Sequence, residues 1–467
     1  MFKISVAWLS FGLLLSTLVA CTPAAKPSVE QSVKTEQDKA LTAVIVDDLG
    51  LGEAIPRRWA SEGNGTFKVI NVTEDEFRSA KFVLQPEVDV VVFTNRLFGD
   101  LIAEGQLLEI DETTGSLGIN RENILSHYRE NLTRYGNQTM ALPVGAPQLA
   151  LFYRTDLLPE KPPQTWAELT AFLPSGDGEV AGFLEPLSGP WAAHSLLARV
   201  APAIRFRGRI STVFDLETME PLISSEPFVR ALSEMVEQHR KLQTKEFLSP
   251  KEAFERLVAG KAKMAITWPQ PSDTGDSPKL DIAVTRLLTT SEWYDAAQEK
   301  WVKRDENMQR NIDYLGSDGR LVGIAKNTLR ANEAIAFAVW LSSNQVSQKL
   351  MPESQASGPF RLSHLASVGL WTKGSIPDSA VDLYADLTRQ VHEGEMCLTF
   401  PRVSRQSEYL DALANAVRAA IEGRLPPTDA LAEAANEWQK ITESVGFEKQ
   451  KDILRRTEGL LTSKFVD

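Results

Sequence analysis

Short apolar runs that end in polar loops and precede helical segments constrain the fold of this chain most strongly. Leu41–Val46 (LTAVIV) ends in two aspartates and a glycine-containing loop, and a helical stretch follows. Val88–Phe93 (VDVVVF) is almost continuously apolar, as expected of a parallel strand that is covered on both faces. These units predict an α/β fold in which ligands gather at the carboxyl ends of the strands.

The same alternation of strands and helices continues along the chain. Further strands are predicted at Phe67–Val72, Ala141–Val144, Ala150–Tyr153, Lys263–Thr267, Ile282–Val284 and Leu321–Ala325. Helices are predicted at Leu97–Leu108, Trp166–Phe172, Phe228–His239, Pro250–Ala259, Asn332–Leu341, Glu408–Glu422 and Ala430–Ser444. Because the chain has 467 residues, we expect more than one hydrophobic core.

Charge and motif content argue against several classes of function. The chain has 50 basic and 62 acidic side chains, a net charge of −12, which disfavours binding to nucleic acid. The sequence contains neither a G-x-S-x-G nor an H-E-x-x-H motif, and the glycines at Gly50 and Gly52 lack the third glycine of a dinucleotide loop. His392–Cys397 (HEGEMC) lacks the further ligands of a metal site. We therefore predict a protein that is not an enzyme and has neither cofactor nor metal. A glycan-active hydrolase stays an alternative, since the separation of two carboxylates is a spatial quantity.

The first forty residues predict an exported and anchored protein. Residues 1–20 contain a basic residue and an apolar run, as in a signal peptide, and Leu18-Val19-Ala20-Cys21 resembles a bacterial lipobox with Cys21 as the lipidation site. An uncleaved anchor with an accidental cysteine is the alternative. Residues 21–40 have almost no large apolar side chain and are predicted to form a flexible tether. We thus expect a location in the cell envelope, lipid-anchored and facing the periplasm or the exterior. With Cys21 acylated, Cys397 would have no partner for an intramolecular disulfide.

Five segments, in this order, resemble extracellular solute-binding proteins of ABC importers, of the maltodextrin-binding type. They are Asp89–Ile110, Ala141–Trp166, Ala253–Pro269, Gly323–Leu341 and Tyr409–Trp438. The sequence departs from the maltodextrin pattern at Pro186–Pro221, which puts the identity of the ligand in doubt.

The resemblance implies the two-lobed periplasmic-binding-protein fold (type II), in which hinged lobes close over a ligand in a central cleft. One lobe would comprise residues 41–146 and 271–328, the other residues 147–270 and 329–467. The implied function is capture of a carbohydrate or similar polar solute by lobe closure and its delivery to ABC permease subunits. The protein would be a monomer held at the membrane by its lipid. The alternative is an envelope sensor or a protein-binding module that takes no part in transport.

Aromatic residues that match cleft positions of the family are candidates for stacking against sugar rings. They are Phe93, Trp191, Trp268 and Tyr409, with Trp371 as a further contributor. A sugar ring presents an apolar C–H face to an aromatic ring, while its hydroxyls need hydrogen-bond partners. For each aromatic residue, a place in the core or at the rim is the alternative.

Polar candidates follow the first two strands of the body. They are Asp47, Asp48, Thr94, Asn95 and Arg96. Carboxylates and amides bond vicinal hydroxyl groups in well-defined geometry. Asp47 could instead cap the segment that follows it.

Overall fold

The computed structural model describes residues 40–110, 118–158, 161–173, 180–204, 212–242, 246–271, 280–304, 312–356, 358–394 and 396–460. The predicted signal peptide, nearly all of the tether and Cys21 lie outside these ranges. From Leu41 onward the chain forms one compact unit. Among the described helices, none combines the length and the apolar character needed to cross a membrane.

A six-stranded sheet contains the first strands of the chain. Its order is β2-β1-β3-β14-β4, and β7 also pairs with β14. The bounds are β1 (Leu41–Val46), β2 (Phe67–Val72), β3 (Val90–Thr94), β4 (Leu107–Leu108), β7 (Leu142–Gly145) and β14 (Arg320–Ala325). Strands β1, β2 and β3 are parallel, whereas β14 runs antiparallel to β3. We call this the first sheet.

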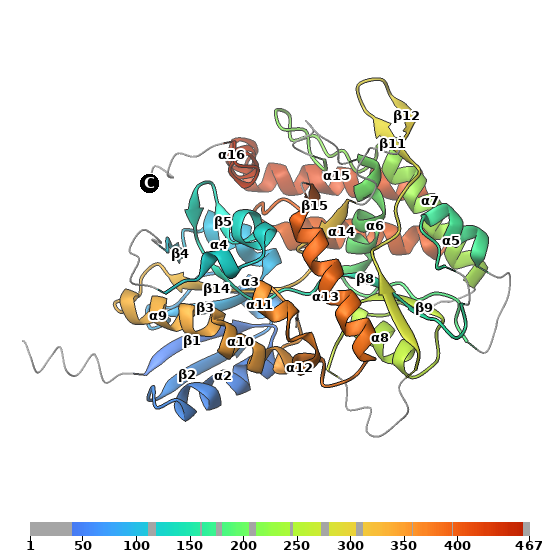
Figure 1. Cartoon of the computed structure of the whole chain (residues 1–467). Helices are drawn as coiled ribbons and strands as arrows, with labels where there is room; N and C mark the ends of the chain where they lie inside the picture. The colour runs from blue at the N-terminus through green and yellow to red at the C-terminus, as the bar shows by residue number, and fades with distance from the viewer. Residues whose placement is uncertain are drawn as a thin grey trace, which may run out of the picture. The chain divides into compact units, whose positions relative to one another are not determined.

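Alternate side chains of β3 reach two different cores, because successive residues of a strand point to opposite faces. Val90 and Val92 belong to the cluster that contains Phe337. Val91 and Phe93 belong to a larger cluster that also contains residues of the second sheet, described next. The helices near the first sheet are α2 (Leu49–Ser61), α3 (Glu74–Ser79), α4 (Phe98–Ala103), α9 (Ala331–Ser342) and α10 (Asn344–Leu350), as Figure 1 shows.

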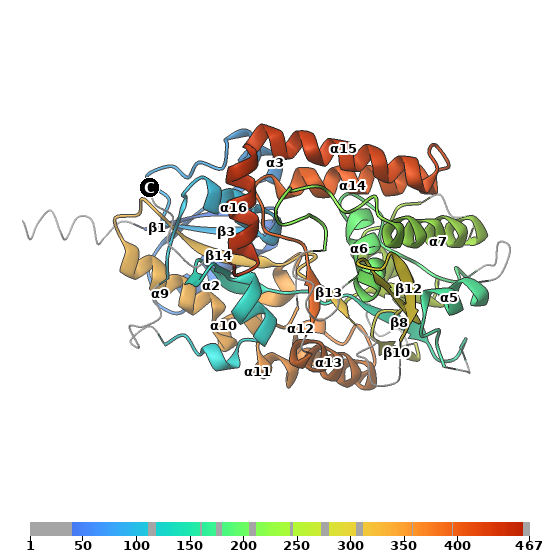
Figure 2. The ribbon, with the colours of Figure 1, turned by 90° about the horizontal axis from the view of Figure 1, so that it is seen from above.

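A second, smaller sheet has the order β10-β8-β9 and is antiparallel. Its strands are β8 (Ala150–Arg154), β9 (Met264–Thr267) and β10 (Ile282–Thr285). Around it the chain forms α5 (Trp166–Phe172), α6 (Trp191–Ile204), α7 (Glu226–Leu242), α8 (Pro250–Val258) and α13 (Asp378–Glu393). In Figure 2, α14 (Gln406–Ile421) and α15 (Pro427–Val445) run side by side next to α6 and α7. We call the strands β10, β8 and β9 the second sheet.

The remaining elements are short or lie near the carboxyl terminus of the chain. They are β5 (Arg134–Tyr135), β6 (Gln138–Thr139), β11 (Glu292–Asp295), β12 (Lys300–Lys303), β13 (Asp313–Leu315), β15 (Cys397–Thr399), α11 (Leu362–Leu365), α12 (Val368–Thr372) and α16 (Phe447–Thr457). Single helical turns are η1 (Asn95–Leu97), η2 (Arg121–Asn123), η3 (Tyr128–Leu132) and η4 (Met351–Glu353).

The predicted α/β fold class is confirmed, and most predicted elements are present with nearly the predicted bounds. The expected helix Leu97–Leu108 is an exception. Helix α4 ends at Ala103, Gly105 adopts a φ of +60°, and the chain then forms β4. A glycine in this left-handed conformation commonly follows the end of a helix. Helices α3, α10, α11, α12, α13 and α16 were not predicted.

The structure differs in two places from the expected division into residues 41–146 plus 271–328 and residues 147–270 plus 329–467. Strand β10 pairs with β8, so its backbone hydrogen bonds place it in the second sheet. Helix α9 packs Phe337 and Leu341 into the core that contains Val92 of the first sheet. An amphipathic helix lies where its apolar face finds a partner, and chain position alone does not reveal that place.

Candidate ligand-binding site

A cavity of about 570 Å³ lies among loops that follow or precede strands of both sheets. This volume is in the range usual for small-molecule sites. Its lining comprises Trp191, Ser249, Pro250, Lys251, Trp268, Gln270, Pro271, Asp318, Arg320, Pro352, Glu353, Ser354, Gln355 and Lys373. Two of these, Trp191 and Trp268, were predicted from the sequence to be site residues.

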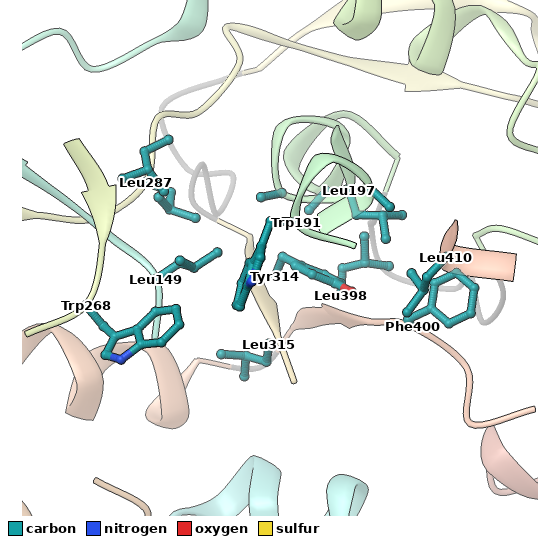
Figure 3. Packing of buried hydrophobic residues seen from close by; sticks show 14 of the residues in the cluster. Leu149, Trp191, Leu197, Trp268, Leu287, Tyr314, Leu315, Leu398, Phe400 and Leu410 are labelled. Atoms are coloured by element: carbon teal, nitrogen blue, oxygen red, sulfur yellow. The ribbon is translucent and has the colours of Figure 1, made fainter. Parts of the chain in front are cut away.

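The two tryptophans lie next to each other at the cavity. Trp268 follows β9 and Trp191 is the first residue of α6, and their ring centroids are 5.3 Å apart with the ring planes at 43°. Figure 3 shows both rings near Leu149. Trp191 and Trp268 are only 9% and 3% exposed, but both line the cavity. Among the described residues, the Trp268 Nε1–H has no hydrogen-bond acceptor. A solute that enters here thus meets aromatic surface, next to a buried indole donor without a partner among the described residues.

A neutral histidine lies behind the Trp191 ring. The His194 ring is 5.3 Å from that of Trp191, and its Nδ1 is 2.9 Å from the Tyr314 hydroxyl. Burial lowers the pKa of His194 to about 3. The imidazole is therefore uncharged at neutral pH and packs as a polar aromatic ring that helps to fix the position of Trp191.

The amino-terminal end of α8 forms another part of the lining. Ser249 caps this helix: its Oγ accepts a hydrogen bond from the Glu252 N–H at 3.2 Å, and its own N–H donates to Glu252 Oε2 at 2.7 Å. This reciprocal capping box satisfies two backbone donors that the helix itself leaves unbonded. It fixes the direction in which Pro250 and Lys251 enter the helix beside the cavity.

We expect Ser249→Ala to lower the free energy of unfolding by about 1 kcal/mol, because the helix loses its side-chain cap. Chemical denaturation measures this change. Ser249→Thr keeps the hydroxyl group and serves as the matched control. Equal stability of Ser249→Ala and the unmodified protein would show that the cap is unimportant.

A buried network centred on Arg320 forms the opposite part of the lining. Arg320 is 3% exposed; its Nη1 donates to Asp318 Oδ1 at 2.9 Å, and its Nε lies 3.1 Å from Asp48 Oδ2. Asp48 Oδ2 also accepts from the Ser354 hydroxyl at 2.7 Å, while its Oδ1 accepts from the Leu51 N–H. Asp48 is therefore the cap of α2 and holds three lining residues, Arg320, Ser354 and Gln355, although it does not itself line the cavity.

Asp47 makes a different set of contacts. It adopts a φ of +50°, its Oδ1 accepts from the Glu74 N–H at 3.0 Å, and its carbonyl accepts from Arg320 Nη2 at 2.8 Å. Burial is the main cause that raises the pKa of Asp47 above its usual value. Asp47 thus bonds the first turn of α3 instead of capping α2, and it touches the site only through Arg320.

The three polar residues at the carboxyl end of β3, Thr94, Asn95 and Arg96, are not lining residues. Asn95 Nδ2 donates to the Asp318 carbonyl at 3.0 Å. Arg96 Nη2 donates to Glu74 Oε2 at 2.8 Å, and the Thr94 hydroxyl donates to the same oxygen at 3.5 Å. Burial opposes the charge of Glu74, but the ion pair with Arg96 and a hydrogen bond from a serine hydroxyl hold its pKa below the usual value. The side chains of Thr94, Asn95 and Arg96 therefore join α3, β3 and the turn before β14.

The structure places Phe93, Trp371 and Tyr409 in the core and not at the cavity. All three are 0% exposed, so their rings have no free face to offer a solute. Phe93 stacks on Phe98 with ring centroids 6.0 Å apart. Tyr409 accepts at its carbonyl from Trp438 Nε1 at 2.8 Å, as part of the packing of α14 against α15. The sequence shows that these rings are large and apolar but does not show which surface covers them.

Twelve of the fourteen described lining residues were not predicted from the sequence. Among them are Lys251, Gln270, Asp318, Arg320, Glu353 and Lys373. A usable signal existed for Gln270, which stands in the same post-strand loop as Trp268. No local pattern distinguished Arg320 and Lys373 from the other basic residues, because tertiary structure alone brings them to the cavity.

Comparison with known proteins supplies a family for this arrangement. A family model described as bacterial extracellular solute-binding protein matches residues 61–377, more than half of the chain. Among curated proteins, a search finds no match.

Solved structures share the fold at low sequence identity. An ABC transporter solute-binding protein from Agrobacterium radiobacter in complex with ribitol is 19% identical, with a TM-score of 0.66 over 86% of this chain and 98% of that chain. Maltose-bound MalE3 of T. maritima is 18% identical, with a TM-score of 0.61 over 86% and 100%. A cyclo/maltodextrin-binding protein complexed with maltotetraose is 14% identical, with a TM-score of 0.60 over 87% and 98%.

Proposed function

We propose that this chain, which belongs to the bacterial extracellular solute-binding proteins, binds a sugar or polyol in the cavity beside Trp191 and Trp268. It would then pass the solute to the permease of an ABC importer. The observation that carries this proposal is the pair of adjacent tryptophans at a cavity with unused polar groups. The ribitol, maltose and maltotetraose in the structures of similar fold support it.

The chemistry of the lining suits a polyhydroxylated solute. An indole face accommodates the C–H surface of a sugar ring, while the rim hydroxyls exchange hydrogen bonds with amide, indole and carboxylate groups. Trp268 Nε1 and Gln270 Nε2 are buried and have no acceptor among the described residues. A buried donor without a partner is unfavourable, so a solute oxygen that accepts from it gains free energy on binding.

Loops of both sheets contribute to the lining, so closure over the solute is part of the proposal. Trp268 follows a strand of the second sheet, and Arg320 begins a strand of the first. If the solute contacts both residues in a closed arrangement of the loops but only one of them in an open arrangement, it shifts the conformational equilibrium toward the closed form. The solute would be bound and released chemically unchanged.

The cellular location is proposed from the sequence of the leader. A signal peptide over residues 1–20 and a lipid on Cys21 would place the body outside the inner membrane, at the end of the tether 21–40. Metabolic labelling with a fatty-acid analogue tests this, since Cys21→Ser should abolish the label.

We expect Trp268→Ala to weaken sugar binding by about 1–3 kcal/mol, that is, roughly fivefold to 150-fold in Kd. The indole offers the solute both a stacking face and a hydrogen-bond donor. Isothermal titration with the best sugar or polyol from a thermal-shift screen measures the loss. Trp268→Phe keeps a ring but has no N–H, so its affinity should lie between those of Trp268→Ala and the unmodified protein.

Trp340→Ala is the matched control, because Trp340 lies on α9 and does not line the cavity. This variant should lose stability without losing affinity. A folded Trp268→Ala protein with unchanged affinity would remove this residue from the site. Recovery of a cleaved or modified sugar from the complex would contradict binding without catalysis.

A further inference from the structure

We infer that the solute carries an anionic oxygen group, a carboxylate or a phosphate, in addition to its hydroxyls. This inference rests on the proposed function and narrows it from sugars and polyols in general to their acidic derivatives. It follows from the unsatisfied donors and the charges that line the cavity.

The buried polar atoms of the lining that lack partners are donors. Trp268 and Gln270 are 3% and 6% exposed. Trp268 Nε1 and Gln270 Nε2 find no acceptor among the described residues. An indole N–H can only donate, and an amide nitrogen likewise. Hydrogen bonds from such donors are stronger when the acceptor is ionised.

Two lysines at the cavity have no strong ion pair. No described carboxylate lies within ion-pair distance of Lys373, which follows α12 with a φ of +50°. Lys251 is in the first turn of α8, and its Nζ lies 4.0 Å from Glu255, one turn further along the exposed surface of that helix. An exposed pair at this distance contributes little. Both ammonium groups are thus available to a solute.

The acidic side chains of the lining do not cancel these charges. Asp318 is already paired with Arg320 at 2.9 Å, which leaves Glu353 as the other lining carboxylate. Arg320 is also paired with Asp48, so among the described lining residues the two lysines, Lys251 and Lys373, face one carboxylate outside these pairs, Glu353, in a chain whose net charge is −12. The overall field of such a chain repels anions, so a local excess of positive charge is needed for an anionic solute to bind here.

Matched sets of neutral and acidic solutes test this inference. We suggest glucose, glucuronate and glucose 6-phosphate, then ribitol, ribonate and ribitol 5-phosphate, then maltose and maltobionate, each titrated calorimetrically into the whole mature protein. At least one acidic member should bind roughly tenfold more tightly than its neutral counterpart. Whether the carboxylates or the phosphates are preferred identifies the anionic group. The preference should shrink when the salt concentration is raised, because both lysines are exposed to solvent.

Lys373→Gln should weaken binding of the preferred acidic solute by roughly fivefold to tenfold, and leave the affinity for its neutral counterpart within about twofold. Lys326→Gln is the matched control, since Lys326 is exposed and does not line the cavity. Neutral members that bind as tightly as the acidic ones would overturn this inference and leave the proposed function intact. Failure of every member to bind would count against the proposed function itself, and with it this narrower inference.

Discussion

Glu185→Gln is expected to lower the free energy of unfolding by about 3–5 kcal/mol, the cost of leaving a buried charge without its partner. Glu185 and Arg199 have side chains that are 0% and 1% exposed. Two hydrogen bonds join them, from Arg199 Nε to Oε1 at 2.8 Å and from Nη2 to Oε2 at 2.6 Å. The Arg199 guanidinium also lies 3.9 Å over the ring of Trp166. The variant keeps the shape of the site but leaves the guanidinium charge uncompensated.

The effect should depend on pH in a defined direction. Burial opposes the charge of Glu185, but Arg199 and His239 lower its pKa from 4.5 to about 2. A carboxyl whose pKa is lower in the folded state stabilises the protein above its unfolded pKa and loses that contribution as the pH falls. The difference in stability between the unmodified protein and Glu185→Gln should therefore be full above pH 4.5 and shrink toward pH 2.

Chemical denaturation at several pH values measures both quantities. The matched control is Glu437→Gln, which removes one partner of a surface pair whose side chains are 70% and 51% exposed. Exposed pairs contribute about 0–1 kcal/mol, so this control should change stability little. If Glu185→Gln were no more destabilising than Glu437→Gln at neutral pH, the buried Glu185–Arg199 pair would not contribute to the free energy of unfolding as expected.

Asp48→Ala should lower the free energy of unfolding by about 3 kcal/mol and weaken solute binding at least roughly tenfold. The change removes the cap of α2 and a partner of the buried Arg320, and it frees the Ser354 hydroxyl. Arg320 and Ser354 line the cavity, so loss of the carboxylate disturbs the site from beneath. Asp48 thus acts as a positioning residue.

Two variants separate the causes of this loss. Asp48→Asn keeps an oxygen that can accept from the Leu51 N–H but has no charge for Arg320, so it should recover the cap and only part of the affinity. Thr73→Ala removes a comparable cap, that of α3, and should cost about 1 kcal/mol without a change in affinity. Equal affinities of Asp48→Ala and the unmodified protein would exclude the positioning role.

The parts of the fold that depend on local pattern could be predicted well. Leu41–Val46 is observed as a strand with the predicted bounds, because its β-branched run is bounded by polar loop residues. The five ordered segments led to the correct family, and the family model confirms that prediction. The site was harder. Trp268 was proposed because it follows a strand, and it lines the cavity, whereas Phe93, the next-to-last residue of β3, points into the core.

The sequence by itself determined the α/β class, the bounds of most strands and the membership of a solute-binding family. Periodicity, propensity and capping act over a few residues, so they can be read directly from neighbouring positions. Tertiary structure alone decided which aromatic rings face the cavity, and that β10 joins the second sheet while α9 packs on the first. It also brought Arg320 to Asp47, 273 positions away, and so completed the charged lining. Contacts at such separation depend on how whole elements pack, and no short window of sequence contains that information.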